Sequence, residues 1–431
     1  MDIQATNLNN AIVKQNVNVL GMLSERGKNI FFPKLGILAQ SAQAKGKDIN
    51  ATIGEAVEDD GSSMHFHEFD SMVKIPGNSA FPYAPSFGKK ELRDTWKEFL
   101  LRKNPSLNNI LISTPVATNG VTHGISIAGY LFVNENDSVI LPDLFWENYS
   151  LIFKNWYGAN VQLFELFHGG GFNINSFSKK INEVKNEKVI ILLNFPNNPS
   201  GYTPLNSEIE PVVNEIHNLA RTGKKVIILI DDAYFGLVYE DKVFKESIFT
   251  KIADLHENIL AVKLDGPTKE DYVWGFRVGF ITYGIKNGTT ELYEALENKT
   301  GGAIRGNISN ISHLSQSLLH ILYSRENYLA EKQKKYDILK TRYNILKDSI
   351  HNQKYSEYFD PLPFNSGYFM CLKLKKGLNT EEVRGHLLNK YSTGVIALGD
   401  VIRLAFSSVP KSKIPALLEN LYNACRDSDI K

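Results

Sequence analysis

Short apolar runs rich in β-branched residues recur through the middle of the chain. They cover residues 109–114, 138–143, 160–166, 188–196, 224–232, 258–266 and 277–284. Most of these runs are continuous rather than alternating, which is typical of strands whose two faces are both buried. The pattern therefore predicts seven strands in this part of the chain.

Helix-like stretches lie between several of these runs. The clearest covers residues 207–223 and ends at Gly223, a residue well suited to the C-cap of a helix. Alternation of strands and helices predicts a mostly parallel sheet covered by helices, an α/β architecture. In such sheets, ligands bind outside the carboxyl ends of the strands.

The pattern changes after about residue 310. Residues 324–352 predict a long charged amphipathic helix. Strands at 366–375 and 401–408 and helices at 380–391 and 412–426 follow, which indicates a small α+β domain. We predict an N-terminal segment (1–70) packing with the small domain, a large domain (71–320) and a small C-terminal domain (321–431).

Composition and charge exclude several classes of protein. The hydrophobic fraction of 43% and the charged fraction of 22% are those of a soluble globular protein. A net charge of +1 gives no sign of a nucleic-acid or membrane partner, and no run approaches the ~18 apolar residues of a membrane helix. The polar start has no signal pattern, and only Cys371 and Cys425 are present, so we expect a reducing, cytoplasmic location.

Polar residues follow the predicted strands at regular points. Asn198 follows the fourth run, Asp231 and Asp232 end the fifth, and Lys269 follows the sixth with Arg277 eight residues later. Taken singly, each has an ordinary structural interpretation as a turn residue, a helix cap or a solvated lysine. Their order at successive strand ends favours a shared site.

The chemistry of these residues has a common purpose. A lysine amine can form a Schiff base with the aldehyde of pyridoxal 5'-phosphate (PLP). A buried carboxylate, Asp231, would keep the pyridine nitrogen protonated, and Tyr234 and Asn198 can donate hydrogen bonds to the phenolic oxygen. Arg277 would bind the phosphate bidentately.

Four motifs together resemble a known family. "NNPSG" (197–201), "DDAY" (231–234), "TKEDYVWGFRVGF" (268–280) and "VIRLAF" (401–406) look like those of the class I/II aminotransferases, which are fold-type I PLP-dependent enzymes. The likeness is strongest to the aspartate and aromatic amino-acid aminotransferases and covers roughly residues 48–425. The family spacing selects Asp231 as the pyridine partner, but the residues alone leave Asp232 open.

The resemblance extends the cofactor site. It implies that the backbone amides of Gly120, Val121 and Thr122 cradle the phosphate at the start of a helix. It makes Trp146 the aromatic residue that stacks on the cofactor. Tyr83 and Ser309 are similar to residues that reach the phosphate from the neighbouring subunit, so the resemblance implies a homodimer with shared active sites.

The resemblance also implies a substrate site. Arg403 matches the arginine that binds the substrate α-carboxylate, and Arg305 matches one that crosses the dimer to a side-chain carboxylate. The substrate-binding residues expected in this way are Arg403, Arg305, Asn198, Trp146 and Gly54. Aspartate or an aromatic amino acid is the expected amino donor, dicarboxylates being slightly preferred, with a 2-oxo acid such as 2-oxoglutarate as acceptor.

Two positions depart from the family pattern. Gly266 stands where the family usually has a phosphate-binding serine, so one hydrogen bond is missing or is replaced by Thr268 or water. His123 stands where the phosphate loop is usually small.

Other functions find less support. "FHGGGF" (167–172) resembles an esterase oxyanion loop, but no Gly-x-Ser-x-Gly motif accompanies it. His65 and His67 have no third ligand at a recognisable spacing, so no metal is expected, and no dinucleotide fingerprint is present. The remaining alternatives are another fold-type I PLP enzyme, such as a C–S lyase or decarboxylase, and a non-catalytic PLP-binding regulator.

Overall fold

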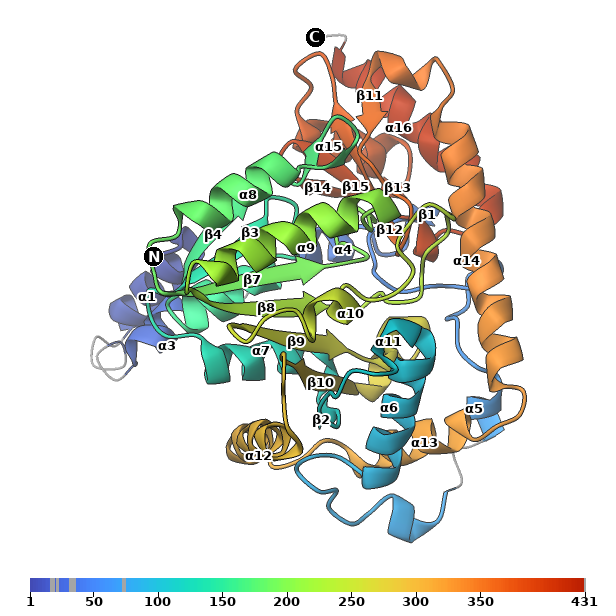
Figure 1. Cartoon of the computed structure of the whole chain (residues 1–431). Coiled ribbons are helices and arrows are strands. Elements are labelled where there is room, and N and C mark those ends of the chain that lie inside the picture. Colours follow the sequence, from blue (N-terminus) through green and yellow to red (C-terminus); the bar gives the residue numbers. More distant parts are fainter. Residues whose placement is uncertain (16–19, 21–22, 31–35, 72–74, 430–431) are drawn as a thin grey trace.

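A seven-stranded sheet lies at the centre of the protein (Figure 1). The structure, a computed structural model, describes residues 1–15, 20, 23–30, 36–71 and 75–429. The strand order is β2-β10-β9-β8-β7-β3-β4, and only β10 runs antiparallel to its neighbours. The strands are β2 (Val116–Thr118), β3 (Ser138–Pro142), β4 (Asn160–Phe164), β7 (Lys188–Asn194), β8 (Lys225–Asp231), β9 (Ile259–Asp265) and β10 (Gly279–Gly284). The predicted mostly parallel α/β sheet is confirmed.

The first predicted strand is the exception. Residues 109–114 form no strand, and β2 begins at Val116 instead. Ser113 still donates its backbone N–H to the Tyr283 carbonyl at 3.0 Å, but Tyr283 returns its own N–H to the Ser113 hydroxyl, so a side chain takes the place of a ladder partner. Pro115 follows and has no N–H to donate, which delays regular pairing until Val116.

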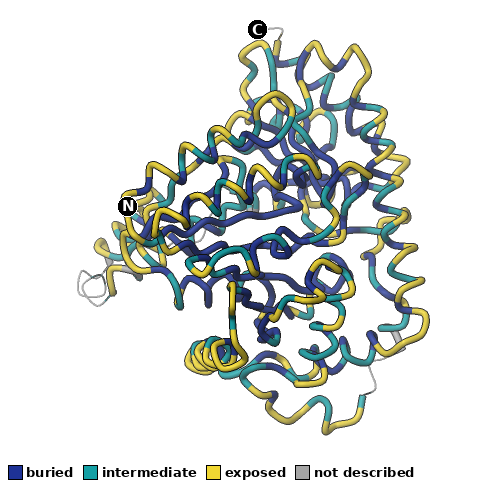
Figure 2. The backbone as a smooth tube through the Cα atoms, in the orientation of Figure 1, coloured by how far each residue is buried: buried dark blue, intermediate teal, exposed yellow. Residues whose placement is uncertain are grey.

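The sheet is buried on both faces (Figure 2). Along β7, Ile190 and Leu192 belong to the core that contains α7 (Gly120–Phe132), whereas Ile191 and Leu193 belong to the core that contains α8 (Ile174–Glu183) and α9 (Asn206–Arg221). This alternation explains the continuous apolar runs. The other helices around this sheet are α6 (Lys90–Lys103), α8 (Ile174–Glu183), α9 (Asn206–Arg221), α10 (Phe249–Ile252), α11 (Pro267–Glu270), α12 (Thr290–Asn307) and α13 (His313–Tyr323). Gly223 follows α9 with φ +90°, which confirms the expected helix end.

A second, antiparallel sheet forms the C-terminal part, with the strand order β11-β12-β15-β14. Its elements are α14 (Tyr328–Ile350), β11 (Phe359–Pro361), β12 (Phe369–Leu374), α15 (Thr380–Lys390), β13 (Thr393–Gly394), β14 (Ile396–Leu398), β15 (Val401–Ala405) and α16 (Ile414–Asp429). The long helix α14 runs along one side of the molecule and joins the two parts (Figure 1). The C-terminal part therefore has the expected α+β character.

The N-terminal residues contact both parts. The elements are α1 (Ile3–Gln15), α3 (Glu25–Asn29), α4 (Ile37–Gln43), β1 (Ile49–Asn50) and α5 (Glu68–Ser71). β1 pairs in parallel with β13, and the Gln40 amide exchanges two hydrogen bonds with the Ala397 backbone, at 3.0 and 2.8 Å. By contrast, α3 contacts a π-helix, η3 (Ser150–Trp156), which lies beside the central sheet. The boundaries at residues 70 and 320 stay predictions.

Short elements complete the fold and account for the esterase-like motif. Residues 167–172 form a tight hairpin between β5 (Phe167–His168) and β6 (Gly171–Phe172), in which Gly169 and Gly170 supply the positive φ angles of the turn. The one-turn 3-10 helices are η1 (Gly77–Ser79), η2 (Pro105–Leu107), η4 (Trp274–Phe276), η5 (Tyr355–Glu357), η6 (Phe406–Ser408) and η7 (Lys411–Lys413). Among the residues that the structure describes, no helix is both long and apolar enough to cross a membrane.

Candidate active site

A cavity of about 590 Å³ opens at the carboxyl ends of the central strands, next to the first turn of α7. The predicted site residues that line it are Gly54, Val121, Thr122, Trp146, Asn198, Asp231, Tyr234, Lys269, Arg277 and Arg403. Other lining residues are Ile37, Ser41, Thr52, Ile53, Glu55, Tyr149, Asn194, Ala233, Thr268, Trp274, Gly275 and Phe369. Residues that are far apart in the sequence therefore meet in one place.

Lys269 extends into this cavity from α11, the single helical turn after β9. Its ammonium nitrogen lies 5.1 Å from the centre of the Tyr234 ring, and no carboxylate of the described chain forms an ion pair with it. Burial lowers the pKa of Lys269 to about 8; Asp231 opposes this shift and Arg277 adds to it. Near neutral pH, a usable fraction of this amine is therefore uncharged and nucleophilic.

Asp231 and Asp232 lie on opposite sides of the chain. Asp231, which is 3% exposed, accepts hydrogen bonds from the Tyr149 hydroxyl at 2.5 Å and from the Ala233 N–H at 3.0 Å. Burial raises the pKa of Asp231, and these two hydrogen bonds act against the shift. Asp232 does not line the cavity and instead forms a buried ion pair with Lys263. Asp231 is thus the carboxylate that faces the cavity.

Arg403 is a buried cation whose hydrogen-bonding capacity is not filled. Its Nη1 donates to Asn198 Oδ1 at 3.2 Å and its Nη2 to the Thr52 carbonyl at 2.8 Å, while the guanidinium lies 4.5 Å from the centre of the Phe369 ring. The Nε atom is buried without a hydrogen-bond partner, and within the described residues no carboxylate pairs with the group. Burial lowers the pKa of Arg403. A carboxylate from a ligand would satisfy this side chain.

The other arginine of the cavity lies at the start of α7. A Cβ atom at Gly120 would come within 2.6 Å of Arg277 Nη2, and one at Gly279 within 2.7 Å of the Val121 nitrogen. The two glycines therefore allow the arginine and the strand β10 to approach the amino end of the helix. Arg277 has φ +52° and forms no ion pair with a carboxylate of the described chain. A guanidinium beside free helical N–H groups is suited to a phosphate.

The two departures from the family pattern have local explanations. A Cβ at Gly266 would lie 2.7 Å from the Gly279 Cα and 2.8 Å from the Val278 carbonyl oxygen, so a serine does not fit there. Thr268, which lines the cavity, donates weakly to the Val278 carbonyl at 3.4 Å. The Nδ1 of His123 accepts the Asn119 backbone N–H at 3.0 Å, so this ring supports the loop itself.

Four predicted site residues do not line the cavity: Gly120 directly precedes the lining residue Val121, and the other three lie away from it. Tyr83 is 88% exposed, and Arg305 is exposed on α12. Ser309 follows α12 with φ +67°, and its carbonyl accepts a hydrogen bond from the Ser86 hydroxyl at 2.7 Å. The segments around Tyr83 and Ser309 are therefore neighbours on the surface, and none of the three residues reaches the cavity of its own chain.

Two residues that the sequence motifs do not indicate, Tyr149 and Asn194, support Asp231. Tyr149 lies three residues after Trp146, and its ring meets the Trp146 ring edge to face at 5.6 Å. Asn194 donates its side-chain amide to the Asp231 carbonyl at 2.8 Å and accepts the Asn198 N–H at 2.8 Å. Asn194 ends β7 directly opposite Asp231 on β8, so the register of the two runs was the signal that could have identified it.

The comparisons with known proteins agree with this geometry. The profile of the family "Aminotransferase class I and II" matches residues 74–421, so the chain belongs to this family of PLP-dependent enzymes. An aminotransferase of Anaerococcus prevotii has a solved structure with a TM-score of 0.83 and 25% identity, covering 93% of this chain and 98% of that one. The kynurenine aminotransferase of Pyrococcus horikoshii, solved in complex with PMP, has a TM-score of 0.79 at 15% identity and covers 97% and 100% of the two chains. The fold-type I architecture is confirmed.

Relatives found by sequence are more distant. An aspartate aminotransferase of Sulfurisphaera tokodaii is 28% identical over 202 residues, which are 46% of this chain and 47% of that protein. A probable aspartate/prephenate aminotransferase of Aquifex aeolicus is 24% identical over 249 residues, or 58% and 60% of the two chains. The chain thus spans about half the length of the relatives it matches.

Proposed function

We propose that this protein is a PLP-dependent aminotransferase that moves an amino group between an α-amino acid and a 2-oxo acid such as 2-oxoglutarate. One observation carries the proposal. A single cavity holds the amine of Lys269, the buried carboxylate of Asp231 and two arginines, Arg277 and Arg403, and none of the three cations forms an ion pair with a carboxylate of the described residues. Such a set of groups is costly for a protein to maintain unless a ligand of complementary charge occupies it.

The residues present fit pyridoxal 5'-phosphate. Arg277 and the amides of Gly120, Val121 and Thr122 would hold its phosphate, Asp231 its pyridine nitrogen, Asn198 and Tyr234 its phenolic oxygen, and Trp146 would stack on its ring. When bound, the cofactor supplies an electron sink for the bonds at the substrate Cα. Its covalent attachment is assigned to Lys269, the one amine that the cavity contains within the described residues.

The chain's own groups have distinct roles in this proposal. Arg403 would bind the substrate α-carboxylate, because its Nε has no hydrogen-bond partner and each of its Nη atoms makes one hydrogen bond. The Lys269 amine, whose pKa of about 8 leaves part of it uncharged near neutral pH, would accept the proton from the substrate Cα. Asp231 would face the pyridine nitrogen of the cofactor and keep it protonated, and the Tyr149 hydroxyl, which donates to Asp231, orients this carboxylate.

A homodimer is also part of the proposal. The exposed side chains of Phe81 (89%) and Tyr83 (88%) lie on the segment that contacts Ser309, next to the partly exposed Ile308 and Leu314. An exposed patch of large apolar side chains is typical of a protein interface. In a dimer, Tyr83 and Ser309 would reach the partner's phosphate site. Cys371 and Cys425 are free and buried, which supports the expected cytoplasmic location.

The lining of the cavity bears on the substrate side chain. Among the described lining residues, the cations are Lys269, Arg277 and Arg403, and the proposal assigns each of them to the cofactor or to the α-carboxylate. A second carboxylate, as in aspartate, would therefore need Arg305 from the partner subunit. Ile53 and Trp146 offer apolar contacts to an aromatic side chain in its place. Aspartate and aromatic amino acids are thus the proposed donors.

A panel of amino donors tests this function. With 2-oxoglutarate as acceptor, we expect glutamate to form with aspartate or an aromatic donor, dicarboxylates being slightly preferred. Mass spectrometry of the products measures the transfer. Formation of ammonia or carbon dioxide without glutamate would indicate a lyase or a decarboxylase, and a cofactor-loaded protein that is inert with every donor would indicate a non-catalytic binder.

Arg305→Leu tests both the substrate assignment and the dimer. We expect the change to raise KM for aspartate by about 10-fold or more, because a charged hydrogen bond is worth roughly 1.5–3 kcal/mol, and to leave KM for phenylalanine nearly unchanged. Mixing Arg305→Leu with inactive Lys269→Ala subunits should restore aspartate turnover, because each mixed dimer has one complete site. Equal effects on both substrates, or no restoration on mixing, would contradict the assignment.

A further inference from the structure

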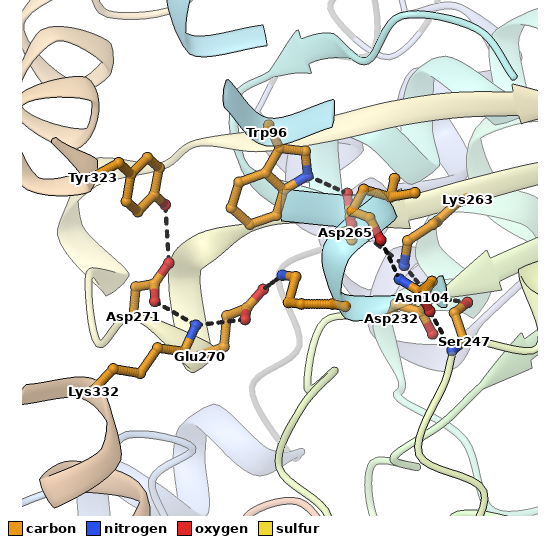
Figure 3. A network of polar contacts seen from close by, with 12 residues as sticks. Trp96, Asn104, Asp232, Ser247, Lys263, Asp265, Glu270, Asp271, Tyr323 and Lys332 are labelled. Atoms are coloured by element: carbon orange, nitrogen blue, oxygen red, sulfur yellow. Dashed lines mark hydrogen bonds and ion pairs between the residues drawn. The ribbon is translucent and has the colours of Figure 1, made fainter. Parts of the chain in front are cut away.

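Two buried carboxylates directly follow Lys269. Glu270 is 4% exposed and Asp271 is fully buried. Lys103 Nζ lies 2.8 Å from Glu270 Oε1. Lys332 Nζ lies 2.7 Å from Glu270 Oε2 and 2.8 Å from Asp271 Oδ1 (Figure 3). Neither carboxylate lines the cavity, so this group of four charged residues lies behind the lysine turn and not in front of it.

Three helices contribute to the group. Lys103 comes from α6, Tyr323 from α13, and Tyr328 and Lys332 from α14. The Tyr323 and Tyr328 hydroxyls donate to Asp271 at 2.9 and 2.8 Å. Burial by itself would raise the pKa of Glu270, but Lys103 and Lys332 lower it to about 2. Glu270 is therefore ionised throughout the neutral range. The two ammonium groups of Lys103 and Lys332 face the two carboxylates of Glu270 and Asp271, so the four side chains together carry no net charge.

Different groups contact Lys269 on the two sides of its turn. On the cavity side, Asp231 on β8 and Arg277 after η4 act on its amine, and the Tyr234 ring packs against it. On its backbone, the Tyr368 hydroxyl donates to the Lys269 carbonyl at 2.8 Å. On the other side of the turn, the next two residues in sequence, Glu270 and Asp271, are the carboxylates that pair with Lys103 and Lys332. Removal of one ammonium group would leave a net negative charge at the backbone turn that follows Lys269.

We propose that Lys332, together with Lys103, is a positioning residue. The ion pairs of these two lysines hold the turn after Lys269 and neutralise the carboxylates of Glu270 and Asp271. The inference rests on the proposed function, in which Lys269 carries the cofactor. Because α14 also contacts α16 and η6 of the C-terminal part, Lys332 ties that part, which contains Arg403, to the lysine turn. A purely structural ion pair would affect stability without changing the protonation of Lys269.

The test is a pH titration, followed by absorbance, of the cofactor-loaded full-length protein. In Lys332→Met, the linkage between Lys269 and the cofactor should have its pKa raised by about 0.5–1 unit, because an unbalanced carboxylate favours the protonated, positive form. Lys332→Arg should return the pKa to the unmodified value. Lys347→Met is the matched control, because Lys347 also lies on α14 and pairs at 2.5 Å with Glu240, away from the turn.

Several results would contradict the positioning role of Lys332 or the proposed function. An unshifted titration in Lys332→Met, or the same shift in Lys347→Met, would overturn the inference while leaving the proposed function intact. If Lys332→Met does not fold, Lys103→Met replaces it and should shift the pKa in the same direction; no shift there would overturn the inference. An unmodified protein that shows no linkage at Lys269 would overturn both the inference and the proposed function.

Discussion

Lys269→Ala is expected to lower kcat for transamination by about 10⁴-fold or more, because covalent attachment of the cofactor and proton transfer at the substrate Cα are lost together. The residue is placed for both tasks: its amine lies in the cavity, forms no ion pair within the described part of the chain, and has a pKa of about 8. Single-turnover measurements with the amino donor would quantify the loss. The variant should keep the fold, because the Lys269 side chain forms no ion pair with any of the described residues.

Borohydride reduction supplies the matching chemical test. After reduction and peptide mapping, the pyridoxyl group should be found on the peptide that contains Lys269. Lys251→Ala serves as a control, since this lysine pairs at 3.0 Å with Glu210 on the surface and should keep full activity. A pyridoxyl group on any other lysine would end the assignment.

Asp231→Asn is expected to lower kcat by about 10²–10³-fold, because an amide cannot balance the positive charge of a protonated pyridine nitrogen. The neighbouring Asp232→Asn is a matched control with a different expected result. Asp232 pairs with the buried Lys263 on the other side of the chain, so its loss should reduce the free energy of unfolding by about 3 kcal/mol and leave kcat of the folded enzyme nearly unchanged. Steady-state kinetics and chemical denaturation of both variants provide the comparison. The assignment is wrong if the two variants exchange these effects.

Much of the fold was predictable because it depends on local patterns. Continuous apolar runs identified six of the seven central strands within a few residues, since a strand buried on both faces has no polar position to interrupt the run. Gly223 marked the end of α9 because only a positive φ fits there. The strand at 109–114 was wrong because Ser113 and Pro115 changed the hydrogen-bond partners in a way that hydrophobicity does not reveal.

The candidate site was predictable to the extent that its motifs are short and ordered. Asn198, Asp231, Tyr234, Lys269, Arg277 and Arg403 were identified from motifs, and all of them line the cavity. Tyr149, Thr52 and Asn194 were not identified, because their contribution is a contact with a residue distant in sequence. The sequence gives no reason for Gly266 in place of a phosphate-binding serine. The structure supplies one, because the backbone of Val278 and Gly279 occupies the space that a serine side chain would need.

The sequence by itself determined which residue types are present and at which strand ends they lie. It determined the α/β class, the small α+β part and the order of the lysine and the arginine eight residues after it. Only the tertiary structure decided between Asp231 and Asp232, because the choice depends on which face of the chain meets the cavity and which meets Lys263. It alone brought Lys103 and Lys332 to the turn behind Lys269. These contacts join helices α6 and α14 to a turn that is distant in sequence, and they form only when the helices pack against it.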